Sequence, residues 1–147
     1  MQEGRVYLFI HIITEVSQRA PLIKKSLRAV FYGWCKKFGE EKAIRFIRIG
    51  GSDDHMHYLI QLHPAQNLLQ VVKQLKDESA KFIHESKLLQ DDFAWKEDYT
   101  AFTVSPGAYN QTFEFIERQE DYHLSKSFEQ EMEQISKTRI DLHEPNN

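Results

Sequence analysis

Two histidines lie two positions apart in residues 53–60, which read DDHMHYLI. Successive side chains of a β-strand point to opposite faces, so His55 and His57 would project together, with Met56 pointing the other way. Two neighbouring imidazoles on a rigid strand can bind one divalent ion if a third ligand comes from elsewhere in the chain. The alternative is a pair of partly exposed histidines at the end of a sheet, because an isolated His-x-His is common.

A helix predicted over residues 109–123 offers a third ligand. Phe115 and Gln119 are four residues apart, so they share a helix face that is displaced from the stripe expected to face the core. The side-chain oxygen of Gln119 suits a hard cation. The alternative is that Phe115 is only the edge of a wide apolar stripe.

Three further residues near the histidine pair have two interpretations each. Asp53 and Asp54 either tune the histidines or serve as turn and cap residues. His11 falls in an apolar strand, and there a hydrogen-bonded core histidine is the expected role. Lys76 either touches phosphate or is a solvated helix lysine.

The charge distribution separates the first third of the chain from the rest. The 147 residues carry a net charge of −3, yet residues 1–50 alone carry +6, residues 51–100 carry −4 and residues 101–147 carry −5. A basic segment can attract phosphate locally in an acidic chain, although a solvated helix face would have the same composition. The basic candidates there include Arg19, Lys24, Lys25 and Arg28.

Composition and length limit the class of protein. The chain is 17.4 kDa with 41% hydrophobic residues, which is enough for one packed domain. The single cysteine, Cys35, excludes a disulfide framework and a multi-thiolate zinc site and fits a reducing compartment. The longest apolar run, residues 6–13, is too short to cross a membrane and does not resemble a signal peptide. We therefore expect a cytoplasmic protein with no membrane partner.

The order of periodic segments predicts an α+β fold. Alternating or apolar runs predict strands over residues 6–13, 43–49, 55–62 and 100–104, and helical spacing predicts helices over residues 21–39, 67–83 and 109–123. The turn at residues 50–53 makes the second and third strands antiparallel. The strand-helix-strand-strand-helix-strand-helix order is that of a ferredoxin-like antiparallel sheet packed by helices. Residues 1–124 form the expected domain, and residues 125–147 a charged C-terminal helix and tail.

Five segments, in order and spacing, resemble the single-tyrosine HUH transposases, which include insertion-sequence transposases and REP-associated tyrosine transposases. The matching segments are residues 10–13 with 19–22, residues 50–60, residues 71–76 with Ser79, Trp95 with residues 99–105, and residues 115–119 with His123. They extend over about residues 6–123. This is far more specific than His-x-His alone.

The resemblance implies DNA transposition and recombination by a metal-dependent homodimer. His55 and His57 would bind Mg²⁺ or Mn²⁺, with Gln119 as third ligand, and the ion would polarise a scissile phosphate of single-stranded or hairpin DNA. In the family a helix tyrosine attacks that phosphate and forms a 5′-phosphotyrosine. Arg19, Lys24, Lys25, Arg28 and Lys76 are the expected DNA-binding residues.

The sequence departs from the family at the nucleophile, because Phe115 stands where the motif has tyrosine. Phenylalanine has no hydroxyl and cannot form the covalent intermediate. Either the chain is a Tyr→Phe variant made to trap a complex, or it is a natural relative that binds DNA without cutting it, or another tyrosine (Tyr122 or Tyr109) substitutes. The remaining functional alternatives are a non-catalytic DNA-binding regulator derived from a transposase and a ferredoxin-like binding module unrelated to DNA.

Overall fold

The computed structural model describes residues 4–139 and contains one four-stranded antiparallel sheet with the strand order β2-β3-β1-β4. This is the ferredoxin-like arrangement that the element order predicts. The elements are β1 (Phe9–Glu15), α1 (Lys25–Lys42), β2 (Arg45–Gly51), β3 (His55–Gln61), α2 (Leu68–Ser86), β4 (Thr100–Val104), α3 (Tyr109–Glu117), α4 (Gln119–Tyr122) and α5 (Phe128–Arg139), with short 3₁₀ turns at Ser17–Arg19 and Pro106–Ala108.

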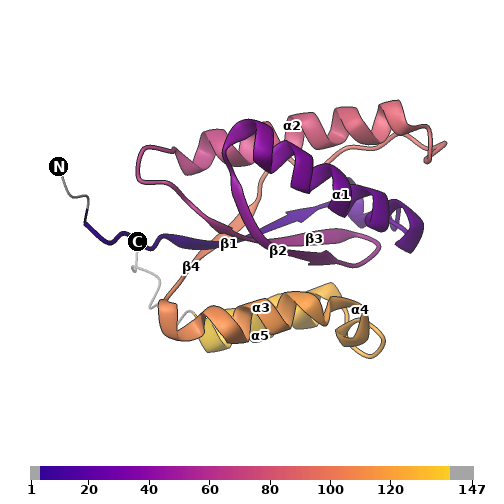
Figure 1. Cartoon of the computed structure of the whole chain (residues 1–147). Helices are drawn as coiled ribbons and strands as arrows, with labels where there is room; N and C mark the ends of the chain where they lie inside the picture. The colour runs from indigo at the N-terminus through magenta and orange to yellow at the C-terminus, as the bar shows by residue number, and fades with distance from the viewer. Residues whose placement is uncertain (1–3, 140–147) are drawn as a thin grey trace, which may run out of the picture.

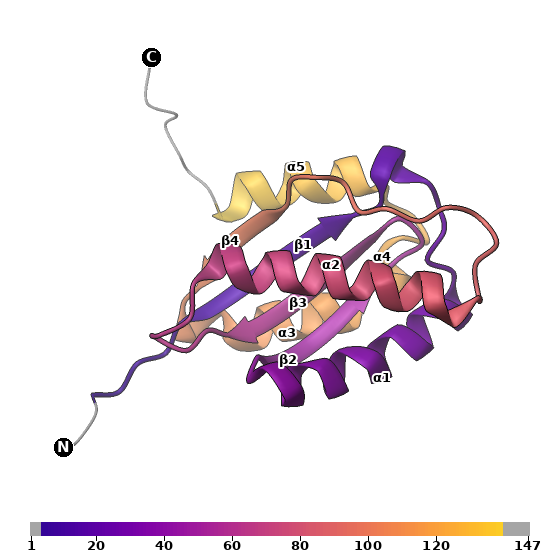
Figure 2. The ribbon, with the colours of Figure 1, turned by 90° about the horizontal axis from the view of Figure 1, so that it is seen from above.

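Helices α1 and α2 cover one face of the sheet, as Figures 1 and 2 show. The larger core lies between them and the strands, because every second residue of β1 and β3 points to this face. Its members include Ile10 and Ile12 of β1, Met56 and Tyr58 of β3, and Phe31 of α1. All of them are at most 7% exposed.

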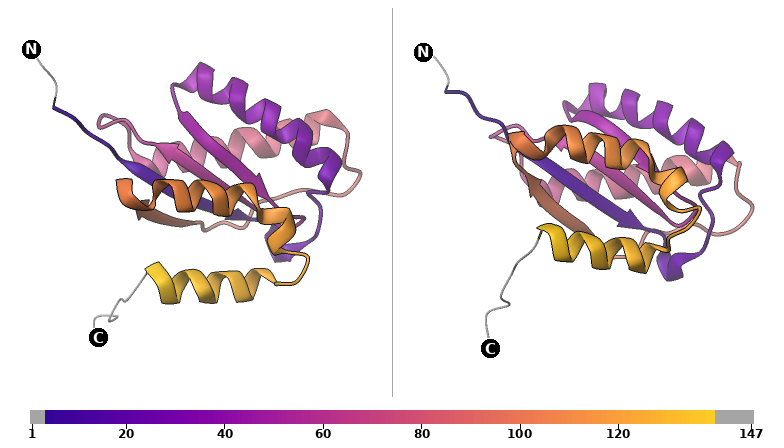
Figure 3. Two further views of the ribbon diagram at one scale, coloured as in Figure 1. Left: turned by 60° about the horizontal axis from the view of Figure 1, so that its bottom comes forward. Right: turned by 90° about the horizontal axis from the view of Figure 1, so that it is seen from below.

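Helices α3, α4 and α5 cover the opposite face. In Figure 3 the view from below shows α3 and α5 on the same side of the sheet, with β1 visible between them. Two smaller apolar clusters hold them there: Ile116 of α3 packs with Leu59 of β3, and Phe128 and Ile135 of α5 pack with Ile13 of β1. Both faces of the sheet are therefore buried, which agrees with the apolar composition of β1.

Two helix boundaries differ from the prediction. The predicted helix over residues 21–39 begins only at Lys25 and ends at Lys42, past Gly39. Gly39 lies inside the helix rather than at its end. Glycine suits this position because a Cβ there would lie 2.6 Å from the Ile44 carbonyl oxygen. The end falls at Ala43 instead, which has φ of 55° and left-handed backbone.

The sequence predicts one continuous helix over residues 109–123, and this prediction is wrong. The structure divides it into α3 and α4 at Arg118, whose φ of −96° and ψ of 19° are not helical. This break turns the chain near the histidine pair and so changes which side chains meet there. The N-cap predicted at Asn67 is confirmed, since its side chain accepts a hydrogen bond from the Gln70 amide at 3.2 Å.

Candidate functional site

Strand β3 places His55 and His57 on the face covered by α3, α4 and α5, while Met56 lies in the core on the other face. The expected sharing of one face is therefore confirmed. The alternative of partly exposed histidines is wrong, because both side chains are 0% exposed. They are buried because helices cross this end of β3, a feature that strand spacing alone does not reveal.

The neighbouring strand makes room for these helices. Gly50 of β2 lies directly opposite His57 in the antiparallel register. A Cβ at Gly50 would lie 2.2 Å from the carbonyl oxygen of Ile116, so only glycine allows α3 to approach so closely. The helix that carries Phe115 thus rests directly on the sheet beside the histidines.

Gln119 meets the histidines within the same subunit. It is the first residue of α4 and 1% exposed. Its Oε1 lies 3.1 Å from His55 Nε2, and its Nε2 donates to Glu131 Oε2 at 2.8 Å. The break at Arg118 brings Gln119 to this position at the start of a new helix.

Glu131, on α5, is a member of this candidate site that the sequence reasoning missed. It is 0% exposed, and its Oε1 lies 2.9 Å from His57 Nε2 and 3.2 Å from His55 Nε2. A signal was present in the sequence: Glu131 falls between Phe128 and Ile135 at spacings of three and four, on the apolar face of α5. A carboxylate on such a face requires a buried polar or cationic partner.

His123 completes the group at the end of α4. Its Nε2 lies 3.2 Å from Glu131 Oε2 and 3.1 Å from Gln119 Oε1. Its Nδ1 lies 2.8 Å from the Lys126 carbonyl oxygen, to which it donates. We use the term histidine–carboxylate cluster for His55, His57, His123, Glu131 and Gln119.

Two residues outside the cluster orient its histidines. Asp54 Oδ1 lies 2.7 Å from His55 Nδ1, and His11 Nε2 lies 2.7 Å from His57 Nδ1. The role expected for His11, a hydrogen-bonded core histidine, is thereby confirmed. Asp53 instead pairs with Lys24 and Arg28 at 3.0 and 2.8 Å.

The environment of the cluster shifts the pKa values of its members in different directions. Burial lowers the pKa of His57 to about 4. Burial opposes the charge on His55 as well, but hydrogen bonds to Asp54 and Glu131 raise the pKa of His55 to about 9. Burial also disfavours the ionised carboxylate of Glu131, yet hydrogen bonds from the three histidines hold its pKa far below the ordinary value. Glu131 is thus a carboxylate that needs positive charge beside it.

The donor set fits a divalent cation. One ligand atom each from His55, His57 and Glu131 lies within 4.8 Å of the others, and all three residues are buried. Imidazole nitrogen and carboxylate oxygen are ligands that divalent ions accept. The side-chain oxygen of Gln119 adjoins the same space.

Phe115 lies against this cluster. Its ring centroid is 5.6 Å from that of His57 and 6.3 Å from that of His11. It also lines a cavity of about 300 Å³ together with Glu131 and Tyr122. The ring of Tyr122 is 5.7 Å from that of Phe115, and its hydroxyl donates to Gln134 Oε1 at 3.0 Å.

The five predicted DNA-binding residues all contact other parts of the protein. Arg19 pairs with Glu15 and Glu129, Lys24 with Asp53, Lys25 with Glu120, and Arg28 with Asp53 and Glu120, while Lys76 donates to the carbonyl oxygens of Glu97 and Asp98. Arg28 is the most buried, with 7% of its side chain exposed, whereas 82% of the Lys25 side chain is exposed. Of the two, Lys25 is the one that solvent reaches freely.

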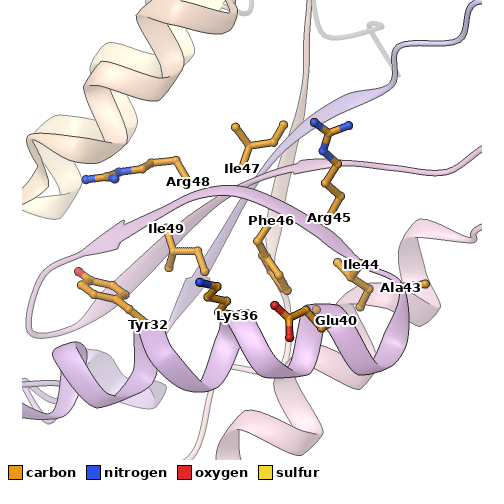
Figure 4. Close-up of a pocket in the computed structure, with 11 residues that line it drawn as sticks. Tyr32, Lys36, Glu40, Ala43, Ile44, Arg45, Phe46, Ile47, Arg48 and Ile49 are labelled. Atoms are coloured by element: carbon orange, nitrogen blue, oxygen red, sulfur yellow. The ribbon is translucent and has the colours of Figure 1, made fainter.

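A cavity of about 790 Å³ lies between α1 and the edge strand β2. Figure 4 shows Lys36 between α1 and β2, whereas the side chains of Arg45 and Arg48 project from the side of β2 that faces away from α1. We refer to it as the α1–β2 groove. Its basic lining residues are Lys36, Arg45 and Arg48.

The comparisons with known proteins place this chain in a family. Residues 5–119 match the model of the family described as "Transposase IS200 like", so the chain belongs to the IS200-like transposase family. The recognition made from the sequence motifs is confirmed. A comparison with curated proteins gave no significant match.

Two solved structures share the fold. A candidate transposase from Deinococcus radiodurans R1 is 20% identical with a TM-score of 0.64, covering 81% of this chain and 98% of that one. A REP-associated tyrosine transposase bound to a REP hairpin is 12% identical with a TM-score of 0.62, covering 84% of this chain and 74% of that one. Between Gly4 and Arg139, no helix is long and apolar enough to cross a membrane.

Proposed function

We propose that this transposase-family protein binds single-stranded or hairpin DNA and holds Mg²⁺ or Mn²⁺ at His55, His57 and Gln119, without cutting the strand. The observation that carries the proposal is the convergence of these three side chains in one subunit, with the ring of Phe115 beside them. The hairpin bound to one structural neighbour supports DNA as the partner.

The residues divide the work of such a site. His55 and His57 offer nitrogen ligands on a rigid strand, and Gln119 offers an amide oxygen from a helix start. A divalent ion held there would neutralise charge on a bound phosphate. Phe115 supplies a hydrophobic ring where the family has its tyrosine, so no oxygen is available to attack phosphorus.

The proposal includes three properties of the whole protein. We propose that it is a homodimer, because the resembling family is dimeric. The cluster assembles within one subunit, so dimerisation is not needed to build it. Light scattering on the eluting protein measures the oligomeric state directly.

We also propose a cytoplasmic location, where DNA and reduced thiols such as Cys35 occur together. Residues 1–124 are proposed as the DNA-processing domain.

The test is a binding and adduct assay with hairpin and single-stranded oligonucleotides. We expect Mn²⁺-dependent binding by the wild type without a covalent protein–DNA band on a denaturing gel. A covalent band with the wild type would contradict the role of Phe115, and a Tyr122→Phe variant would then identify whether Tyr122 is the nucleophile. Weak binding that does not depend on salt would instead favour the module unrelated to DNA.

The variant Phe115→Tyr extends the test. The cavity beside Phe115 offers space for a hydroxyl close to the cluster. We expect this variant to form a covalent adduct in the presence of Mn²⁺, and the double variant Phe115→Tyr with His57→Gln to form none. If Phe115→Tyr stays inert on all family-type substrates, the chain is not a latent nuclease.

A DNA-binding regulator derived from a transposase is the second candidate. It is favoured by the missing hydroxyl at Phe115 and by the burial of both histidines beneath α5. A regulator would bind DNA selectively after loss of both histidines, whereas the metal-dependent function would lose binding in the variant with His55→Gln and His57→Gln.

A further inference from the structure

We propose that α5 is an autoinhibitory lid, which competes with a DNA strand for the histidine pair and for Arg19 and is displaced when the strand binds. The inference rests on the proposed function, because it gives the DNA-binding site of that function a closed state. The family match covers residues 5–119, whereas α5 extends over Phe128–Arg139. The lid therefore lies beyond the part of the chain that the family model describes.

The lid places a carboxylate on the groups that a bound phosphate would need. Glu131 Oε1 lies 2.9 Å from His57 Nε2 and 3.2 Å from His55 Nε2, and Gln119 Nε2 donates to Glu131 Oε2 at 2.8 Å. All four residues are at most 1% exposed. Carboxylate and phosphate oxygens are both anionic acceptors, so they seek the same donors and cations. A strand therefore cannot reach the histidine pair while Glu131 occupies this position.

A second contact of the lid also involves an expected DNA-binding residue. Arg19 forms an ion pair with Glu129, and its guanidinium carbon lies 5.0 Å from the centroid of the Phe128 ring. Gln18 and Arg19 have φ of 57° and 53°, a left-handed backbone that persists where surrounding contacts hold it. The Glu129 side chain is 64% exposed, and an exposed ion pair contributes little free energy. A phosphate group would compete with Glu129 for the same guanidinium.

Helix α5 is built so that it can move as a unit. The Ser127 amide donates to Gln130 Oε1 at 2.8 Å, and the Gln130 amide donates to Ser127 Oγ at 3.2 Å. This reciprocal pair caps the start of the helix without help from the rest of the protein. Residues 124–127, which join α4 to α5, are all exposed, and Leu124 is 85% exposed. The helix can therefore swing about this segment and stay folded.

The apolar attachment of the lid is small and separate from the main core. Phe128 and Ile135 pack against Ile13 in a cluster of their own, whereas the larger cluster lies beneath α1 and α2 on the other face of the sheet. Opening the lid would expose the small cluster and leave the larger one intact. Local opening of this kind requires less free energy than unfolding of the whole domain.

Hydrogen–deuterium exchange of the full-length protein without DNA tests whether the lid opens. We expect the amides of α5 to exchange by local opening, faster than those of α2. Glu129→Gln should accelerate exchange of α5 by about 2–5-fold, the range expected for loss of one exposed ion pair. Glu131→Gln should accelerate it more, and neither variant should change α2. If α5 exchanges as slowly as α2 in the wild type and in both variants, α5 is a fixed part of the fold and the inference is wrong.

The same measurement with Mn²⁺ and a hairpin or single-stranded oligonucleotide tests displacement. At strand concentrations well above Kd, we expect exchange of α5 to become at least about 10-fold faster. Fluorescence anisotropy should show about 2–5-fold tighter DNA binding by Glu129→Gln, because a closed population lowers the apparent affinity of the wild type. This variant keeps the test decisive if Glu131→Gln does not fold.

Glu114→Gln on α3 is the matched control for charge. Glu114 is exposed on the face of the sheet that also carries α5, so this variant removes one negative charge without touching the lid. It should leave exchange of α5 unchanged and tighten DNA binding less than Glu129→Gln does. Equal gains in affinity for the two variants would attribute the effect to net charge and overturn the competition.

The outcomes separate the lid from the proposed function. If DNA binds and α5 stays protected, or if Glu129→Gln and Glu131→Gln both bind DNA more weakly than the wild type, α5 belongs to the bound state. The inference then fails while the proposed function stands. If no strand binds to the wild type or to either variant, the proposed function itself fails, and the competition with DNA fails with it.

Discussion

Phe115 lies beside the histidine–carboxylate cluster. Its ring lies 5.6 Å from the His57 ring and 5.7 Å from the Tyr122 ring, so it is in contact with the cluster. Under the proposed function, the missing hydroxyl is what separates Phe115 from the family's tyrosine. The missing group is a single oxygen atom, which explains why one substitution is a meaningful test of function.

The environment of Arg28 gives this residue a structural role in place of the expected DNA contact. Its Nη1 donates to the Ile23 carbonyl oxygen at 2.7 Å and to Asp53 at 2.8 Å, and its Nη2 donates to Glu120 at 3.1 Å. These bonds raise the pKa of Arg28, although burial acts in the opposite direction. A guanidinium occupied in this way joins α1 to the β2–β3 turn and to α4.

We therefore expect Arg28→Met to act on stability more than on DNA affinity. The unpaired Ile23 carbonyl oxygen and lost ion pairs should lower the free energy of unfolding by about 1–3 kcal/mol. Lys25→Met, at an exposed position, should leave stability within about 0.5 kcal/mol and weaken DNA binding. Urea unfolding and fluorescence anisotropy measure the two effects. If Arg28→Met instead weakened DNA binding and left stability unchanged, Arg28 would be a DNA-binding residue.

Helix α3 and strand β2 form the contact that positions the site at the level of elements. The absence of a side chain at Gly50 lets the helix backbone reach the strand, and Ile116 then packs on Leu59. This close approach brings both Phe115 and the following α4 over β3. The geometry of the cluster depends on that spacing.

The variant Gly50→Ala should separate α3 from the sheet. The added methyl group would meet a backbone oxygen, which cannot move aside as a side chain can, so we expect a loss of about 1–3 kcal/mol in the free energy of unfolding. Gly33→Ala is the matched control. Gly33 lies inside α1 with open space around its Cβ position, so alanine there should gain up to about 1 kcal/mol. Equal denaturation midpoints for Gly50→Ala and the wild type would contradict the tight α3–β2 contact.

At the scale of the whole molecule, the basic segment and the histidine–carboxylate cluster lie on different parts of the sheet. The basic first third supplies α1 and β2, and Lys36 of α1 lies in the α1–β2 groove while Arg45 and Arg48 project from the other side of the same edge strand. The histidine–carboxylate cluster lies on the face covered by α3, α4 and α5. An acidic chain can thus present one local basic surface to a polyanion.

Given the proposed function, DNA binding should weaken steeply with salt. Each phosphate contact contributes a slope of about −0.7 in log affinity against log salt for single strands and about −0.9 for duplex DNA. Lys36→Gln, in the groove, should reduce the slope by about one contact. Lys81→Gln on α2, paired at 4.0 Å with Glu85, should not. Equal slopes for the wild type and Lys36→Gln would place the DNA elsewhere on the molecule.

The sequence by itself determined the element order, the sheet type, the shared face of His55 and His57, and the family. These features depend on local spacing, because a strand alternates with period two and a helix repeats every 3.6 residues. The approach of Gln119 was also foreseeable from the family motif, whereas helix spacing alone did not favour it. What local spacing predicts is which side chains share a face.

Only the tertiary structure decided what each face meets. Glu131 and His123 join the histidines because α5 folds back across β1 and because the chain breaks at Arg118, and neither event follows from periodicity. The same holds for Arg28, whose partners lie 25 and 92 residues away. The sequence gives the chemistry of each side chain directly. The partners of that side chain depend on tertiary packing, which involves the whole chain at once.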